Sequence, residues 1–407
     1  MHLAFSDVLS SINAAGIQPS HGIDTHATPP QHICDVYRKY QRMHPGDVDK
    51  DLAIIDPKKG LEGNPLHKLK LRQKVEASRI EFARNKFNQG DHGIDLESLE
   101  AEIVDCDIYE HDDFPGPLCS IPFHTRILIS ACGSGLQIYS GLLPPSTQVT
   151  LLSRLLHREL ANPVHKTNMY TDFRPAAAAE TGEKSSEKQM QLEDDPQQRR
   201  SFFSHPRGSG KAWEPKNPQT HKPLNMSQFM QKLRWLTVGT QYDWTTRSYP
   251  DNRESTFPAD MRNLVQDLFP TVNTESGVIL LYSPKDFMPV HRDVSEDCAH
   301  GIVSISLGCD GLFILANELP EEGDGVAEKS NITSTIVIRV HSGDVVHIAG
   351  KTRFAWHAMP KIIPGTCPPW LADWPALNGG KGNASYNKWK GWMASKRVNI
   401  SCRQVFS

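Results

Sequence analysis

The fold is decided near the end of the chain, by the stretch Arg397-Val398-Asn399-Ile400-Ser401-Cys402-Arg403. Polar and apolar residues alternate there, so an extended strand places Arg, Asn, Ser and Arg on one face and Val, Ile and Cys on the other. The apolar face indicates burial in a sheet. The two arginines then point into the protein and need an anionic partner, because an unpaired buried guanidinium is costly. The alternative is an exposed edge strand with solvated charges.

Six further apolar runs lie upstream, separated by Gly, Pro and Asp turns. They are Trp235–Val238, Gly277–Tyr282, Gly301–Leu307, Leu312–Leu315, Thr335–Val340 and Asp344–Ala349. Short strands with little helix between them are typical of an antiparallel β-sandwich or barrel. Helices are expected mostly upstream, and the clearest begins with Ser146 as N-cap and ends before Asn162-Pro163. The pattern therefore predicts an α+β fold.

The chain divides into an extension and one large domain. Residues 1–104 are interpreted as an N-terminal extension, partly helical or disordered, and residues 105–407 as the domain. The basic stretch Lys68–Lys86 is predicted to be helical, with charges that form either a solvated face or a phosphate contact. Residues 174–224 are predicted to be a disordered insert, because their acidic, Gln-rich and Pro-rich composition buries too little apolar surface to offset the ordering entropy.

The bulk composition predicts an intracellular protein. The 407 residues carry a net charge of −3, so any nucleic-acid contact must come from a local basic patch. The eight cysteines include no Cys-x-x-Cys pair, which is typical of reduced thiols. The first residues lack a secretory signal, and the most apolar run, Leu118–Cys132, is too short to span a membrane. We expect a nuclear or cytoplasmic location, with mitochondria also compatible, and no membrane contact.

The tripeptide His291-Arg292-Asp293 indicates a metal site. Residues two apart on an extended segment share a face, so His291 and Asp293 can bind one ion. The same spacing also arises by chance between two surface residues at a strand end. Iron(II) needs a third ligand, and two histidines with one carboxylate leave three coordination positions open.

His357 is the favoured third ligand, because it follows Gly350 where the chain is expected to leave a strand. His341 precedes a tight turn and His347 lies inside an apolar strand, so both are interpreted as structural. His300, in an expected loop, is a weaker candidate. The arginines of the last strand fit such a site, because a planar guanidinium matches a carboxylate and 2-oxoglutarate carries two carboxylates.

Taken together, these residues resemble the AlkB family of iron(II)- and 2-oxoglutarate-dependent dioxygenases, in particular its eukaryotic first-homologue branch. The family pattern is Asn-x-Tyr, His-x-Asp, a distant His and Arg-x-Asn-x-Thr-x-Arg. Tyr282 stands nine residues before His291, and Ser401 takes the Thr position of the last motif. Other matching blocks are Leu233–Gly239, Gln241–Trp244, Ser304–Gly308 and His341–Asp344, so the resemblance covers about 105–407.

The resemblance implies a double-stranded β-helix (jelly-roll) core with flanking helices, and it implies roles for seven residues. The residues implied for iron are His291, Asp293 and His357. Those implied for 2-oxoglutarate are Arg397, Tyr282 and Asn399 at the distal carboxylate, and Arg403 near the metal. The resemblance also implies that the enzyme uses O2 together with iron(II) and 2-oxoglutarate.

Three features depart from the family pattern. Leu280 stands where the family has the Asn of Asn-x-Tyr, so one polar contact to the cosubstrate is missing. The gap from His357 to Arg397 is longer than usual. The apolar piece at 117–134 interrupts family-like text, which indicates a lineage-specific insertion or a mistaken gene model.

The implied activity is oxidative demethylation of N-methylated nucleobases in DNA or RNA, with formaldehyde, succinate and carbon dioxide as products. Alternatives are a dioxygenase that acts on a protein or small molecule, and a metal-binding protein without turnover, to which Leu280 points. A base must be unpaired or flipped to react, so single-stranded or looped nucleic acid is the expected partner. Tyr242 and Trp244 could stack on that base, or they could be core aromatics. The sequence leaves open DNA, transfer RNA or messenger RNA, and the oligomeric state.

Overall fold

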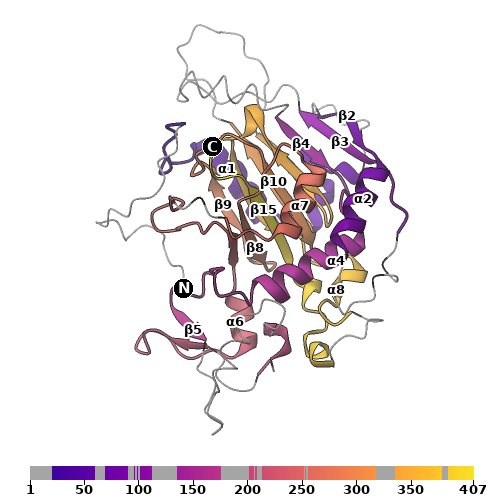
Figure 1. Cartoon of the computed structure of the whole chain (residues 1–407). Helices are drawn as coiled ribbons and strands as arrows, with labels where there is room; N and C mark the ends of the chain where they lie inside the picture. Colours follow the sequence, from indigo (N-terminus) through magenta and orange to yellow (C-terminus); the bar gives the residue numbers. More distant parts are fainter. Residues whose placement is uncertain are drawn as a thin grey trace.

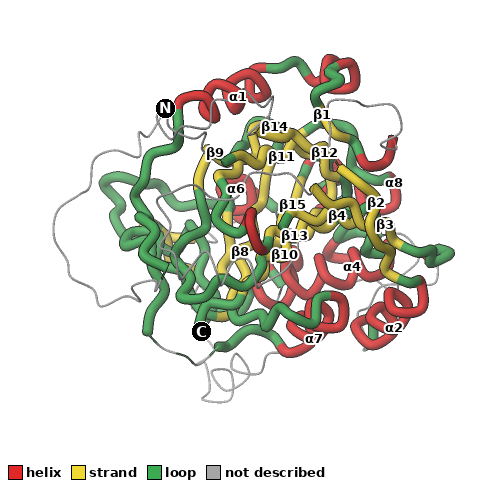
Figure 2. The backbone as a smooth tube through the Cα atoms, turned by 90° about the horizontal axis from the view of Figure 1, so that it is seen from above, coloured by secondary structure: helices red, strands yellow, loops and turns green. Residues whose placement is uncertain are grey.

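The computed structural model describes residues 21–59, 69–89, 96, 99, 101–111, 135–175, 201–205, 207–208, 213–251, 253, 255–317, 335–377 and 384–407. These residues form an α+β fold in which two β-sheets face each other and helices flank them (Figure 1). Seen from above, the strands occupy the middle and most helices lie at the periphery (Figure 2). The α+β prediction is confirmed.

The larger sheet has eight strands, and the last strand of the chain lies inside it. In spatial order the strands are β2 (Leu69–Val75), β3 (Cys106–His111), β4 (Leu136–Tyr139), β13 (Val345–Ile348), β10 (Ile302–Gly308), β15 (Arg397–Arg403), β8 (Ser276–Tyr282) and β7 (Trp235–Gly239). All neighbours pair in antiparallel fashion. Because β15 pairs with β10 on one side and β8 on the other, the exposed-edge alternative is wrong.

The smaller sheet has five strands. Their order is β1 (Ile54–Ile55), β12 (Thr335–Val340), β11 (Gly311–Ala316), β14 (Trp356–Ile362) and β9 (Met288–His291). The β1–β12 pairing is parallel and the others are antiparallel. Two short strands, β5 (Phe173–Pro175) and β6 (Trp213–Pro215), form a separate pair.

The two faces of β15 have the character that the alternation predicts. Val398, Ile400 and Cys402 belong to the large apolar core on the outer side of the sheet. The other face looks into the space between the sheets, where the cross-strand partners of β15 include Ser306 and Tyr282. Apolar side chains of both sheets close the remainder of that space; among them are Leu136, Ile138, Phe313, Leu315, Ile336, Ile338, Val346 and Met359.

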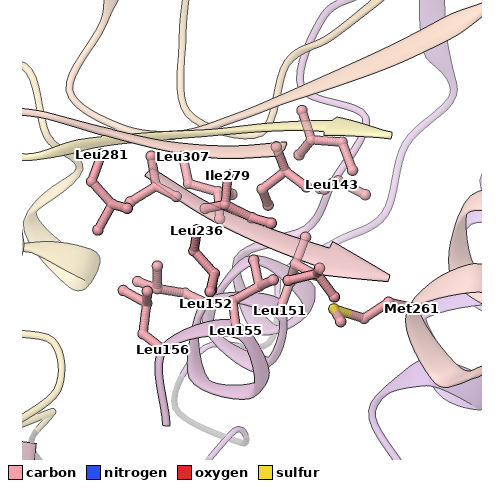
Figure 3. Close-up of a cluster of buried hydrophobic side chains, with 14 of the residues drawn as sticks. Leu143, Leu151, Leu152, Leu155, Leu156, Leu236, Met261, Ile279, Leu281 and Leu307 are labelled. Atoms are coloured by element: carbon pink, nitrogen blue, oxygen red, sulfur yellow. The ribbon is translucent and has the colours of Figure 1, made fainter. Parts of the chain in front are cut away.

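The helices that contribute to the outer core of the larger sheet include α2 (Ala77–Phe87), α4 (Pro145–Ser153) and α7 (Ala259–Leu268). The last turns of α4 continue as the π-helical segment η4 (Arg154–Glu159). The leucines of α4 and η4 lie beneath those of the sheet in Figure 3, which labels Leu151, Leu152, Leu155, Leu156, Leu236, Ile279, Leu281 and Leu307. Ser146 is buried and does not cap α4; Pro144 is the N-cap, and Pro145 opens the helix.

The basic stretch at 68–86 is not one helix. Its first part is strand β2, which pairs with β3, and only the second part is α2. Leucine and valine alternate with lysine and arginine along Leu69–Val75, and this period of two favours a strand over a helix.

The described part of the stretch interpreted as an N-terminal extension packs against the smaller sheet. Helix α1 (Gln31–Arg42) buries Tyr37 and Tyr40 against residues of β11, β12 and β14, and a short 3₁₀-helix, η1 (Pro45–Lys50), leads to β1. Strand β1 extends the sheet beyond β12. Residues 21–59 are therefore part of the same structural unit as the sheets.

The disordered-insert prediction is wrong for its second half. The 3₁₀-helix η5 (Phe202–Ser204) and strand β6 are ordered parts of the core, and Phe203 and Trp213 are buried. Trp213 stacks on Phe229 of α6 (Met226–Lys232), with ring centroids 4.3 Å apart. Bulky aromatic side chains supply the apolar area that the average composition concealed. Residues 176–200 lie outside the described residues, as does the piece at 117–134.

The remaining helical segments of the described chain are short. The 3₁₀-helix η6 (Gly350–Thr352) precedes β14, and α8 (Pro369–Ala372), η7 (Ala384–Trp389) and η8 (Met393–Ser395) lie between β14 and β15; a further 3₁₀ turn, η2 (Pro57–Lys59), follows β1. In the part of the chain that the structure describes, none of the helices combines the length and apolar character needed to cross a membrane.

Candidate active site

Strands β9 and β14 bring two histidines together. His291 is the last residue of β9, and it pairs with His357, the second residue of β14. Their ring centroids lie 4.2 Å apart. Asp293 follows β9 by two residues, and the ligand atoms of the three residues all lie within 4.8 Å of one another. His357 therefore reaches the site from within a strand, rather than from beyond one.

Backbone hydrogen bonds decide which nitrogen of each histidine faces the site. His291 Nδ1 lies 2.8 Å from the carbonyl oxygen of Pro289, and His357 Nδ1 lies 3.1 Å from that of Ala355. A carbonyl oxygen only accepts, so each Nδ1 carries a proton, and Nε2 is the nitrogen of each ring that can bind a metal. The two Nε2 atoms lie 4.0 and 3.8 Å from the carboxylate of Asp293. Burial, with His291 nearby, lowers the pKa of His357 to about 4, which keeps the ring in its metal-binding neutral form.

Arg403 orients the carboxylate of Asp293. One guanidinium nitrogen lies 3.1 Å from Asp293 Oδ2. Burial alone would raise the pKa of Asp293, but Arg403, His357 and His291 outweigh it and hold that pKa well below its usual range. The aspartate is therefore ionised at neutral pH, as a metal ligand must be. Arg403 thus lies beside the candidate iron ligands.

Two residues that the sequence analysis did not single out complete this end of the site. The carboxylate of Glu296 accepts hydrogen bonds from Arg403 at 2.8 Å and from Arg353 at 3.0 Å. Arg353 also donates to the backbone carbonyls of Asp293 and His300, both at 2.7 Å. Glu296 and Arg353 are buried, and each has a partner of opposite charge, because the carboxylate of Glu296 lies between Arg353 and Arg403. Both lie in loops without periodicity, and the one sequence signal is an acid three residues after Asp293.

The other candidate histidines lie elsewhere. His341 is bonded to two carboxylates, with Nε2 at 2.8 Å from Asp56 and Nδ1 at 3.0 Å from Asp310. His347 Nδ1 lies 3.0 Å from the side-chain oxygen of Gln137. Only the backbone carbonyl of His300 takes part in the network at Arg353. In the described part of the chain, none of the three joins the group formed by His291, Asp293 and His357.

Arg397 marks the opposite end of the interior face of β15. Its side chain is 1% exposed, and its guanidinium donates to Ser306 Oγ at 2.8 Å and to the carbonyl oxygen of Cys309 at 3.3 Å. Both acceptors are neutral, and among the described residues Arg397 Nε has no hydrogen-bond partner. Burial lowers the pKa of Arg397, because the charged form lacks water. A carboxylate entering the space between the sheets would complete this arrangement.

Tyr282 and Asn399 share the interior with Arg397. Tyr282, the last residue of β8, is buried and pairs with Arg397 of β15. Asn399 donates to Ser304 Oγ at 2.8 Å and to the carbonyl oxygen of Ile305 at 3.0 Å. Leu280 pairs with Asn399 and is partly buried against the apolar residues between the sheets. An apolar side chain therefore occupies the place where the family pattern has an amide.

Tyr242 and Trp244 lie beyond β7 and differ in exposure. Tyr242 is half-buried, and its hydroxyl lies 3.5 Å from Ser295 Oγ, two residues after Asp293. Burial raises the pKa of Tyr242 to about 12. Trp244 is 40% exposed and lies against Trp235, with ring centroids 5.0 Å apart. Trp244 is therefore not a core residue, and its ring is available to a ligand.

The model of the 2OG-Fe(II) oxygenase superfamily matches residues 189–403, which is more than half of the chain. The chain belongs to this superfamily and is a dioxygenase that uses iron(II), 2-oxoglutarate and O2. Its relatives place it among the AlkB homologues, in the first-homologue branch that the sequence pattern indicates.

Several relatives are named as demethylases, and three of them follow. The N6-methyladenosine RNA demethylase ALKB1 of Pyricularia oryzae is 39% identical over 67% of this chain and 74% of its own length. The N6-methyladenosine RNA demethylase ALKBH of Cryphonectria parasitica is 43% identical over 50% of this chain and 90% of its own length. The tRNA demethylase abh1 of Schizosaccharomyces pombe is 32% identical over 67% and 79%.

The residues present fit the cofactors of the family. Two neutral imidazoles and one carboxylate are the ligand set that iron(II) oxygenases use, and they come from one side of the site. The buried Nε atoms of Arg397 and Arg403 have no hydrogen-bond partners among the described residues, as expected where an anion binds. When bound, iron(II) with 2-oxoglutarate supplies the oxidising power that inserts an oxygen atom of O2 into a C–H bond. Arg397, Tyr282 and Asn399 would hold the cosubstrate at the end distant from the metal.

Proposed function

We propose that this chain is an oxidative demethylase of N-methylated nucleobases in RNA or DNA. The observation that carries the proposal is the His291, Asp293 and His357 group in a chain whose relatives are named as RNA and tRNA demethylases. One oxygen atom of O2 would convert the N-methyl group to N-hydroxymethyl, which then releases formaldehyde and leaves N–H. The other oxygen atom would end in succinate as 2-oxoglutarate loses carbon dioxide.

The proposal includes a double-stranded β-helix core. Eight consecutive strands, β8 to β15, are shared equally between the two sheets. In the larger sheet β8, β15, β10 and β13 are neighbours, and in the smaller sheet β9, β14, β11 and β12 are neighbours; the chain changes sheet after every strand except between β11 and β12. Such an arrangement supports a jelly-roll whose open end holds the iron ligands at β9 and β14.

The proposed substrate is single-stranded or looped. A methyl group on a base edge is out of reach inside a duplex, and extruding a paired base costs a few kcal/mol. Trp244 offers an exposed indole ring next to Tyr242, which contacts the residue two positions after Asp293. Stacking of an unpaired base on that ring supports this choice, because aromatic stacking is available to every base.

Formaldehyde release tests the proposal. Purified protein is given iron(II), ascorbate and 2-oxoglutarate together with matched oligonucleotides that carry one methylated base each, and the control is His291→Ala. We expect formaldehyde from at least one methylated RNA or DNA and none from the control. Succinate formation that is unchanged by every methylated oligonucleotide, with no formaldehyde, would instead favour a protein or small-molecule substrate.

A further inference from the structure

A cavity of about 210 Å³ lies beside the start of β15. Helix α6 and the segment η7–η8 bound it, and its lining includes Arg207, Ser227, Gln231, Trp389, Trp392 and Lys396. The iron ligands lie at the other end of β15, where Arg403 contacts Asp293. At about 3.3 Å per residue, the seven residues of the strand separate the two ends by about 20 Å. The cavity is therefore distinct from the iron site. It lies at the end of β15 that carries Arg397, but Arg397 is not among its lining residues.

The charged groups of this cavity are cationic. The guanidinium of Arg207 lies 4.8 Å from the ring centroid of Trp389 and donates one hydrogen bond, to the carbonyl oxygen of Lys388 at 2.9 Å. An arginine has five N–H donors, so most of its fork remains for a ligand. Lys396 Nζ lies 5.7 Å from the ring centroid of Trp392 and donates to Ser283 Oγ at 2.6 Å. The lining contains no aspartate or glutamate.

The lining also includes a tryptophan whose indole N–H is buried. Trp389 is 1% exposed, and its indole N–H has no hydrogen-bond partner among the described residues. An indole N–H can only donate, and no acceptor among the described residues meets it. Two cations lie on the same lining, and a phosphate group is the anion that such cations bind. The volume is below the roughly 300–1,000 Å³ of sites that enclose whole small molecules, which suits one phosphate group of a longer chain.

Basic and aromatic residues connect the cavity with the iron site. Arg234 is exposed just before β7, the edge strand of the larger sheet, and its guanidinium lies 3.4 Å from the carboxylate of Asp286. Trp235 follows it, Trp244 lies against Trp235, and Tyr242 packs edge-on against Trp244 at 5.0 Å. Tyr242 in turn reaches the loop that carries Asp293. A cationic cavity followed by a row of aromatic rings is the arrangement that proteins use for single-stranded nucleic acid.

We propose that this cavity binds a backbone phosphate of the nucleic-acid substrate, and that the nucleic-acid chain runs from the cavity along β7 to the iron. This inference rests on the proposed function and extends it, because it assigns a second contact about 20 Å from the reacting base. The overall charge of −3 makes such a local site necessary, since the protein as a whole does not attract polyanions.

Two charge reversals test the assignment. Arg207→Glu changes the cavity, and Lys216→Glu is the matched control on an exposed lysine outside it. The probe is a fluorescent single-stranded RNA of about twelve nucleotides without methylation, measured by anisotropy over a range of salt. We expect Arg207→Glu to weaken binding about tenfold relative to the control and to reduce the salt slope by about one. Trp389→Phe, which keeps a ring and removes the N–H, should give a smaller loss.

Substrate length provides the second measurement. At about 3.4 Å per nucleotide, a methylated trinucleotide cannot reach from the iron to the cavity, whereas a twelve-nucleotide strand can. Arg207→Glu should therefore raise KM for the twelve-nucleotide substrate and leave kcat and KM for the trinucleotide unchanged. Inorganic phosphate at constant ionic strength should compete with the labelled strand on the wild type and not on Arg207→Glu.

Equal losses in Arg207→Glu and Lys216→Glu, or an equal decline with both substrate lengths, would overturn the phosphate site. Competition by phosphate without any effect of Arg207→Glu on the labelled strand would assign the cavity to free phosphate and likewise overturn it. A protein that binds the strand through Arg207 but releases no formaldehyde from any methylated oligonucleotide would leave the cavity assigned and contradict the proposed demethylation.

Discussion

Among single residues, His357 and His300 offer a matched test of the iron site. We expect His357→Ala to abolish turnover, because the remaining two ligands cannot hold iron(II) on one face, and His291→Ala or Asp293→Ala to do the same. His300→Ala should keep its activity, since its contribution to the network is a backbone carbonyl. Succinate formation and bound iron are measured, with thermal melting to show that each variant folds. Activity in His357→Ala together with its loss in His300→Ala would reverse the assignment.

Arg397 is expected to determine the affinity for 2-oxoglutarate. Arg397→Lys keeps the charge but cannot form two parallel hydrogen bonds to a carboxylate, which removes about 1.5–3 kcal/mol per charge-assisted bond. This corresponds to a rise of about 10- to 150-fold in KM for 2-oxoglutarate. The control is Arg339→Lys, which alters an arginine paired with Asp310 and Asp49 and should leave that KM unchanged. An unaltered KM in Arg397→Lys would contradict the assignment.

The sequence allowed the ligands and the arginines to be predicted, and it concealed the residues that support them. His291 and Asp293 share a spacing that an extended chain converts into proximity, and the alternation in β15 indicates which way Arg397 and Arg403 point. Glu296 and Arg353 lie in loops, where no period relates position to direction. Their role depends on the approach of two loops far apart in the chain, which only the folded structure defines.

At the level of elements, His341 joins the N-terminal segment to the smaller sheet and makes that attachment sensitive to pH. Burial lowers the pKa of His341, but Asp310 and Asp56 outweigh it, so the pKa is raised above the ordinary 6.5. Arg339, from the preceding strand, binds the same Asp310. When the pKa of a histidine is higher in the folded than in the unfolded protein, its ion pairs stabilise the fold fully at pH values below the unfolded pKa. This stabilisation is lost as the pH rises through the folded pKa.

We therefore expect the free energy of unfolding to fall above pH 6.5 more steeply in the wild type than in His341→Asn, which removes the titrating group. Chemical denaturation at a series of pH values measures the difference. The control is His26→Asn, at an exposed histidine, which should follow the wild type. If wild type and His341→Asn had parallel profiles above pH 6.5, the ion pairs of His341 would not contribute to stability.

Two nested deletions separate the halves of the insert at 174–224. Removing 176–200 should leave the melting temperature nearly unchanged, because its composition predicts little burial and loop length costs little entropy. Extending the deletion to 222 also removes Phe203 and Trp213, which are buried, and each such loss costs about 3–5 kcal/mol. Thermal melting of both proteins decides the matter. A large destabilisation by the shorter deletion would show that 176–200 also packs.

Strands with regular alternation were predicted to within one or two residues, and the two that carry the histidines were missed. Met288–His291 and Trp356–Ile362 each contain a proline, which argues against a strand when only the sequence is considered. In the structure, Pro289 lies on an edge strand, and Pro360 follows the last residue pair between β14 and β9. Both prolines are thus tolerated because no ladder hydrogen bond between these strands is needed there.

For the whole molecule, the position of Trp244 relates the sheet edge to the iron and predicts which nucleic acids react. Trp244→Ala should lose about 1–3 kcal/mol of stacking, and so raise KM for single-stranded methylated RNA about 5- to 150-fold. The KM for 2-oxoglutarate and the bound iron should not change, because Trp244 does not contact their residues. Phe82→Ala is the control, since Phe82 is also an exposed aromatic but lies on α2.

The same reasoning predicts the response to base pairing. If an unpaired base must stack on Trp244 before it reacts, a perfect duplex pays the cost of extrusion first, and the wild type should release less formaldehyde from it than from the matched single strand. Trp244→Ala loses a contact that forms only after extrusion, so it should slow both substrates by a similar factor and leave their ratio unchanged. Equal wild-type rates on duplex and single strand, or a normal KM in Trp244→Ala, would show that the base is held by other residues.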